Sequence, residues 1–142
     1  MWIPQENEDK RRTQDCQPQT PHRTQKAHDR LKFPKSARIV NRSHFKNLLK
    51  NGSRLLGEWL SVDFRKGRSP CPRLGLTVSR RHGKSHDRNR FKRLVRESFR
   101  ELYPTLPCNL EINVFPRKPS TKVDKTIILN DLSQIVNKIR SI

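Results

Sequence analysis

The stretch Arg88-Asn89-Arg90-Phe91-Lys92-Arg93-Leu94-Val95-Arg96-Glu97-Ser98-Phe99-Arg100 decides the fold of this chain. On an α-helix, which turns by about 100° per residue, its apolar members fall on one side. Asp87 is a suitable N-cap for this helix, and Pro104 predicts its end near Tyr103. The stretch therefore predicts an amphipathic helix that packs on a hydrophobic core. The predicted core side consists of Phe91, Leu94, Val95, Ser98, Phe99 and Leu102.

Basic residues occupy a second arc of roughly 140° on the same helix. The nearby acids Glu97 and Glu101 lie outside this arc, although acid–base pairs four residues apart would better suit a merely solvated helix. A field of one charge sign destabilises a fold unless a polyanion neutralises it. We therefore expect phosphates to bind here. The basic arc consists of Arg88, Asn89, Lys92, Arg93, Arg96 and Arg100.

The overall charge points in the same direction. The 142 residues carry a net charge of +19, which is typical of nucleic-acid-binding proteins. The preceding stretch Ser79-Arg80-Arg81-His82-Gly83-Lys84-Ser85-His86 extends the positive field. An anionic membrane surface is the competing partner. It is disfavoured because no run of about 18 apolar residues exists and the basic helix lacks a wide apolar face with Trp.

No catalytic or metal-binding constellation stands out in the sequence. The three cysteines, Cys16, Cys71 and Cys108, form no Cys-x-x-Cys pair, so we expect free thiols and no zinc site. His82 and His86 flank Gly83, but no carboxylate cluster accompanies them. We expect these histidines to be surface or phosphate-contacting residues. A protein-only nuclease is therefore disfavoured.

Composition divides the chain into two parts. Residues 1–36 are polar, charged and rich in proline, so we expect a disordered N-terminal arm. Residues 37–142 hold the apolar periodicity and form one domain. The N-terminus lacks the apolar core of a secretory signal, and its acidic residues disfavour a transit peptide. We therefore expect a cytoplasmic protein.

The folded part reads as an α+β two-layer sandwich. A strand–helix–strand unit brackets the basic helix, and general rules predict a right-handed crossover if those strands are parallel. The other predicted elements are a helix capped by Ser43 and ended by Gly52, extended segments over residues 55–64, 73–79 and 110–115, and a last helix that begins near Asn130.

At this point the residues form a family pattern. The strand Arg73-Leu74-Gly75-Leu76-Thr77-Val78-Ser79, then Gly83, then the Arg-Asn-Arg helix closely resembles the bacterial ribonuclease P protein subunit. The spacing of Phe45, Leu48, Leu49 and Gly52 also resembles the first helix of that family. The resemblance covers roughly residues 37–140. It implies the element order α-β-β-β-α-β-α with a left-handed crossover, which replaces the right-handed one expected from the general rule.

The resemblance also implies a function. In this family the protein binds a catalytic RNA, and the assembled endoribonuclease removes the 5′ leader from precursor tRNA. Mg²⁺ bound with the RNA performs the hydrolysis, so no catalytic side chain and no metal site are expected in the chain. The expected partners are the catalytic RNA and precursor tRNA, with no membrane and no stable protein partner. The alternative is a general or ribosome-associated RNA-binding protein.

The same resemblance assigns site residues. Phe45 and Leu49 are implied to line a cleft for the single-stranded leader, although a second aromatic residue is common at the position of Leu49. Lys84-Ser85-His86 stands where the family usually has Asn-Ala-Val. The basic arc and its surroundings are implied to contact the catalytic RNA. The RNA-binding residues expected are Arg80, Arg81, Lys84, Arg88, Asn89, Arg90, Lys92, Arg93, Arg96 and Arg100.

Overall fold

The computed structural model describes residue 33 and residues 35–119 and 123–142. Its element order, α-β-β-β-α-β-α, confirms the predicted order. Short 3₁₀ helices add η1 (Lys35–Ala37), η2 (Arg80–His82) and η3 (Tyr103–Thr105). The main elements are α1 (Arg42–Asn51), β1 (Ser53–Leu56), β2 (Leu60–Lys66), β3 (Arg73–Leu76), α2 (Ser85–Leu102), β4 (Leu110–Pro116) and α3 (Lys125–Ser141).

The four strands form one sheet in the order β1-β2-β4-β3. β1 pairs with β2 and β2 with β4 in antiparallel fashion. β3 and β4 are parallel neighbours, and α2 connects them. The basic helix is therefore the crossover of a strand–helix–strand unit, as the sequence predicted.

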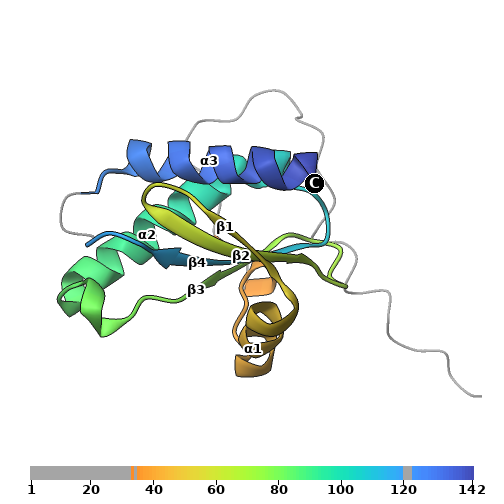
Figure 1. Cartoon of the computed structure of the whole chain (residues 1–142), viewed down its shortest axis with the longest axis horizontal. Helices are drawn as coiled ribbons and strands as arrows, with labels where there is room; N and C mark the ends of the chain where they lie inside the picture. Colours follow the sequence, from red (N-terminus) through yellow and green to blue (C-terminus); the bar gives the residue numbers. More distant parts are fainter. Residues whose placement is uncertain (1–32, 34, 120–122) are drawn as a thin grey trace, which may run out of the picture.

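Helices cover the sheet unequally. α2 and α3 lie side by side over one face, and α1 crosses the opposite face (Figure 1). Between the sheet and the α2–α3 layer lies the main core, where the alternating side chains of β2 and β4 meet the apolar side of α2. Phe91, Val95 and Phe99 are buried there, which confirms the predicted core side. This packing fixes the orientation in which α2 presents its basic arc.

The helix starts differ from the cap predictions. α1 begins at Arg42 after Asn41, so Ser43 lies inside the helix. α2 begins at Ser85 after Lys84, which places Asp87 in its first turn rather than at the cap. There it still suits the positive end of the helix dipole.

The last helix starts earlier than the sequence predicted. α3 begins at Lys125 after Asp124, and Asn130 is an exposed residue inside it. Ile128, two residues before Asn130, is fully buried in the core. Because this apolar contact extends the buried face of α3, packing outweighs the capping preference of Asn130.

The segment predicted as one extended run is a hairpin. β1 and β2 enclose a turn at residues 57–59. The Asp131 carboxylate of α3 accepts hydrogen bonds from the backbone N–H groups of Glu58, Trp59 and Leu60 at 3.0, 2.9 and 2.8 Å. A Cβ on Gly57 would collide with this carboxylate. The turn is thus held by a residue that is distant in sequence.

The core also includes one described residue before Ala37. Phe33 is 5% exposed, and its ring meets the Phe99 ring edge to face with centroids 5.6 Å apart. The rest of the predicted arm, residues 1–32 and 34, lies outside the described residues. No helix in the described ranges is long and apolar enough to span a membrane. Cys108 is free and exposed as expected, whereas Cys71 is buried and is not a free thiol.

Candidate nucleic-acid interface

The basic arc of α2 lies on the outside of the folded chain. Asn89 and Arg93 are exposed, and the remaining arc residues are half-buried along the helix flank. Arginine side chains in such positions keep their charged ends near solvent while their stems cover apolar surface. The structure therefore brings together all six members of the predicted arc.

Within the described part of the chain, none of the five cations in this arc forms an ion pair with a carboxylate. The Nε atoms of Arg88 and Arg100 are buried and have no hydrogen-bond partner there. Glu101 of the same helix pairs with Lys125 of α3 instead. The arc is thus a row of positive charge that no described acid offsets, which is the electrostatic feature a phosphate backbone recognises.

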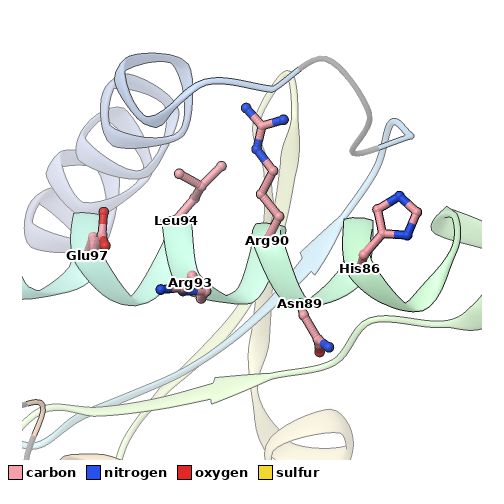
Figure 2. A pocket seen from close by; sticks show the side chains of 6 residues that line it. All are labelled: His86, Asn89, Arg90, Arg93, Leu94 and Glu97. Carbon is pink, nitrogen blue, oxygen red and sulfur yellow. The ribbon is translucent and has the colours of Figure 1, made fainter.

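Arg90 lies outside this row. Its guanidinium Nη2 approaches Oδ1 of Asp124 at 3.7 Å, on the side of α2 that faces α3. Figure 2 shows an open hollow over this part of the helix, with Arg90 and Asn89 pointing in opposite directions. Arg93 and Leu94 also line the hollow. The two arginines of the Arg-Asn-Arg motif therefore differ in their surroundings: Arg88 belongs to the basic arc, whereas Arg90 faces Asp124.

Arg38 adds a cation that the sequence did not single out. Its Nη2 donates to the Phe33 carbonyl at 3.2 Å, and its guanidinium carbon lies 5.2 Å from the centre of the Phe33 ring. Burial, followed by the like charges of Arg38 and Arg100, lowers the pKa of the Arg96 guanidinium. Arg38 therefore extends the positive surface toward the start of the domain. No periodicity pointed to it, because the contact depends on how Phe33 packs.

The upstream basic residues gather at the start of α2. Arg80 and Arg81 lie on the short helix η2, and Lys84 caps α2; all three are exposed. Gly83 joins these two helices with φ of 125°, a conformation that a residue with a side chain rarely adopts. The Gly83 turn therefore places the predicted upstream cations beside the N-terminal end of the basic arc.

The opposite face of the sheet carries α1. Leu48 is fully buried and anchors this helix, whereas Leu49 is 53% exposed. Phe45 is half-buried, and a Cβ on Gly75 of β3 would lie only 2.6 Å from its Cε1. Glycine at position 75 thus lets an aromatic ring lie directly on the strand. Of the two predicted cleft residues, Phe45 contacts the sheet and Leu49 faces solvent.

A polar layer lies on the sheet beneath α1. Asp63 and Asn113 are buried and directly opposite each other in the β2–β4 register. Thr77 donates its hydroxyl hydrogen to Asn113 Oδ1 at 3.1 Å, and Asn113 Nδ2 has no partner among the described residues. Arg54 binds Asp63 in the same layer, and this hydrogen-bonded charge raises the pKa of Arg54. Sequence reasoning missed this layer, because the polar side of β2 reads as a solvent face.

The described residues contain no group of three or more His, Cys, Asp or Glu side chains that could hold a metal ion. The buried carboxylates are already engaged. Asp63 binds Arg54, Glu111 binds Arg65 at 2.9 Å, and Asp131 binds three backbone N–H groups. These groups stabilise the fold rather than offer a ligand set for a divalent cation.

Comparisons with known proteins agree on one family. A family model described as Ribonuclease P matches residues 33–140, a range that begins at the buried Phe33. The ribonuclease P protein component of Chlamydia trachomatis serovar L2 is 41% identical over 86 residues, or 59% of this chain and 72% of that protein. The ribonuclease P protein component of Pseudoalteromonas atlantica is 36% identical over 108 residues, or 75% of this chain and 89% of that protein.

Solved structures give the same result. The RNase P protein from Thermotoga maritima matches with a TM-score of 0.66 at 35% identity, over 71% of this chain and 96% of that chain. The Staphylococcus aureus RNase P protein matches with a TM-score of 0.63 at 28% identity, over 73% of this chain and 94% of that chain. The likeness thus covers almost the whole of each solved protein.

Proposed function

This chain belongs to the ribonuclease P protein family, and from this premise we propose that its two faces bind two different RNAs. The chain is a protein component of ribonuclease P, the RNA-based endoribonuclease of tRNA processing. Its partner in that enzyme is the ribonuclease P RNA.

The basic arc of α2 is the surface we assign to the ribonuclease P RNA. The observation that carries this assignment is the row of five cations that no described carboxylate pairs with. Arginines predominate in the arc, and their planar guanidinium groups suit bidentate contacts with phosphate. Arg80, Arg81 and Lys84 continue the same contact at the N-terminal end of the helix.

The face that carries α1 is the surface we assign to the 5′ leader of precursor tRNA. Phe45 offers an aromatic ring held on Gly75, and Leu49 offers exposed apolar area beside it. Aromatic rings bind single-stranded bases by stacking, largely independently of sequence. A leader bound here would add affinity for precursor tRNA that mature tRNA lacks.

Hydrolysis is assigned to Mg²⁺ held by the RNA. The buried carboxylates of the chain are bound to arginines or backbone N–H groups, so the protein residues contribute binding and orientation rather than metal ligands. When bound, Mg²⁺ would activate water and stabilise the charge that develops on the phosphate. We place this activity in the bacterial cytoplasm.

Reconstitution tests the proposal. The chain is mixed with the ribonuclease P RNA from the same genome and a 5′-extended precursor tRNA at low Mg²⁺ concentration. We expect cleavage only in the full mixture, and not with protein or RNA alone. Cleavage by the protein alone would contradict an RNA-borne metal site. Tight binding of structured RNA without any cleavage would favour the general RNA-binding alternative.

Binding measurements with Phe45 variants test the leader surface. Phe45→Ala should weaken binding of precursor tRNA by about 1–3 kcal/mol and leave mature tRNA binding nearly unchanged. Phe45→Leu is the matched control, because it keeps an apolar contact with Gly75 but cannot stack as an aromatic ring. Full rescue by leucine, or equal losses for precursor and mature tRNA, would show that Phe45 serves only packing.

A further inference from the structure

On the sheet face that carries α1, the Arg54 side chain is held by a bidentate ion pair with Asp63. It lies directly opposite Asp63 in the β1–β2 register. Its Nε and Nη2 donate to the two carboxylate oxygens of Asp63 at 2.5 and 3.0 Å. The Asp63 side chain is 4% exposed, whereas that of Arg54 is 55% exposed. A buried carboxylate therefore fixes an arginine whose outer edge remains open to solvent.

The aromatic ring of Phe115 makes a cation–π contact with the same guanidinium. The Arg54 guanidinium carbon lies 5.6 Å from the centre of the Phe115 ring, which comes from β4. Because β2 separates β1 from β4 in the sheet, the Arg54 side chain reaches across β2 to make this contact. A bidentate ion pair and a ring contact together restrict the plane of the guanidinium.

Donors remain unused on this fixed group. A guanidinium has five N–H donors, and the two side-chain hydrogen bonds of Arg54 both go to Asp63. Three donors are therefore left on a side chain that is more than half exposed. Such a group can form an additional pair of parallel hydrogen bonds with a ligand that offers two adjacent acceptors.

The charge of Asp63 decides which ligand fits best. Arg54 and Asp63 together carry no net charge, so the attraction to a phosphate is weaker than for an unpaired arginine. The direction of the remaining donors, however, is fixed. Guanine presents two adjacent acceptors, O6 and N7, and cytosine presents O2 and N3. Adenine and uracil offer no such pair, because the N6 amino group of adenine lies beside N1 and N7, and the N3–H of uracil lies between O2 and O4.

We propose that Arg54 selects a guanine or cytosine at one position of the single-stranded leader, with Asp63 and Phe115 as its positioning residues. The inference rests on the proposed leader function of this face. Arg54 and Gly75 belong to one row of paired residues that runs through Asp63 and Asn113. With strands spaced by about 4.8 Å, the two ends of this row are about 14 Å apart. One leader can therefore contact both Phe45 and Arg54.

The test uses the reconstituted enzyme and a set of precursor tRNAs in which each leader position carries G, C, A or U in turn. We expect one position at which guanine or cytosine binds about tenfold tighter than adenine and uracil, as one bidentate contact provides. Comparing guanine with cytosine at that position then identifies the base. Mature tRNA measures the binding that does not depend on the leader.

Two substitutions separate geometry from charge. Arg54→Lys keeps the positive charge but loses the planar donor pair, and Arg54→Ala loses both. Both should abolish the base preference, while Arg140→Ala, an exposed arginine on α3 across the sheet from α1, should retain it. The inference is overturned if Arg54→Lys retains the base preference. It is also overturned if the wild type shows no base preference although precursor still binds better than mature tRNA. Equal binding of precursor and mature tRNA by the wild type would overturn the leader function itself.

Discussion

Replacement of Arg93 by alanine gives the sharpest test of the basic arc. Arg93 is exposed, belongs to the arc and forms no ion pair with a described carboxylate. If it neutralises one phosphate, its loss releases one fewer counterion, and the slope of log K against log salt falls by about 0.7–0.9. The ratio of wild-type to variant affinity should then shrink about five- to eightfold when salt rises tenfold.

The assay is a titration of the chain with ribonuclease P RNA at several KCl concentrations and constant Mg²⁺. Arg90→Ala is the matched comparison, because it removes the same side chain from the same helix outside the arc. Asp124 already faces Arg90, so its slope should change less than that of Arg93→Ala. An unchanged slope for Arg93→Ala would refute the assignment of the arc to phosphates.

Three further substitutions test other parts of the structure. Asp131→Ala leaves three backbone N–H groups without their acceptor and should lower the free energy of unfolding by about 3 kcal/mol. A loss below about 1 kcal/mol, measured by urea denaturation, would show that water replaces the carboxylate. Gly75→Ala forces the Phe45 ring to move and should weaken binding of precursor but not mature tRNA; equal effects on both would separate the ring from the leader. Leu49→Phe places an aromatic ring at an exposed position of α1 and should tighten precursor binding by up to about 1–3 kcal/mol, whereas unchanged binding would place position 49 outside the leader path.

The sequence predicted the parts of the fold that depend on periodicity. The apolar side of α2 and the end of α1 at Gly52 were both predicted correctly, because each depends on residues within a few turns of one another. Starts of helices were less predictable. α3 begins at Lys125 because the buried Ile128 extends its packing face, and that contact depends on the sheet beneath it.

The candidate site likewise contains residues that local periodicity predicts and residues that only tertiary packing brings together. The basic arc follows from helical spacing alone, so its residues could be named in advance. Arg38 could not be named, because it joins the arc only through the packing of Phe33 on Phe99. Arg54 and Asp63 face each other only because the segment folds as a hairpin with this register. Without the turn at residues 57–59, the sequence gives no reason to pair them.

The buried polar layer beneath α1 is best understood as a binding surface rather than a stabilising one. An ion pair between a buried carboxylate and a half-exposed guanidinium, such as that of Asp63 and Arg54, contributes little net stability compared with well-packed apolar side chains. The same sheet buries apolar residues of β2 on its other face, where Leu60 and Val62 lie in the main core. A layer of apolar side chains under α1 would hold that helix at least as well. It would not hold a guanidinium in a fixed plane, and it would leave no hydrogen-bond donors for a base. Replacing Arg54 and Asp63 together by leucine should therefore preserve or raise the free energy of unfolding while removing the base preference. A double variant that loses several kcal/mol of stability would instead show that this pair holds the hairpin together.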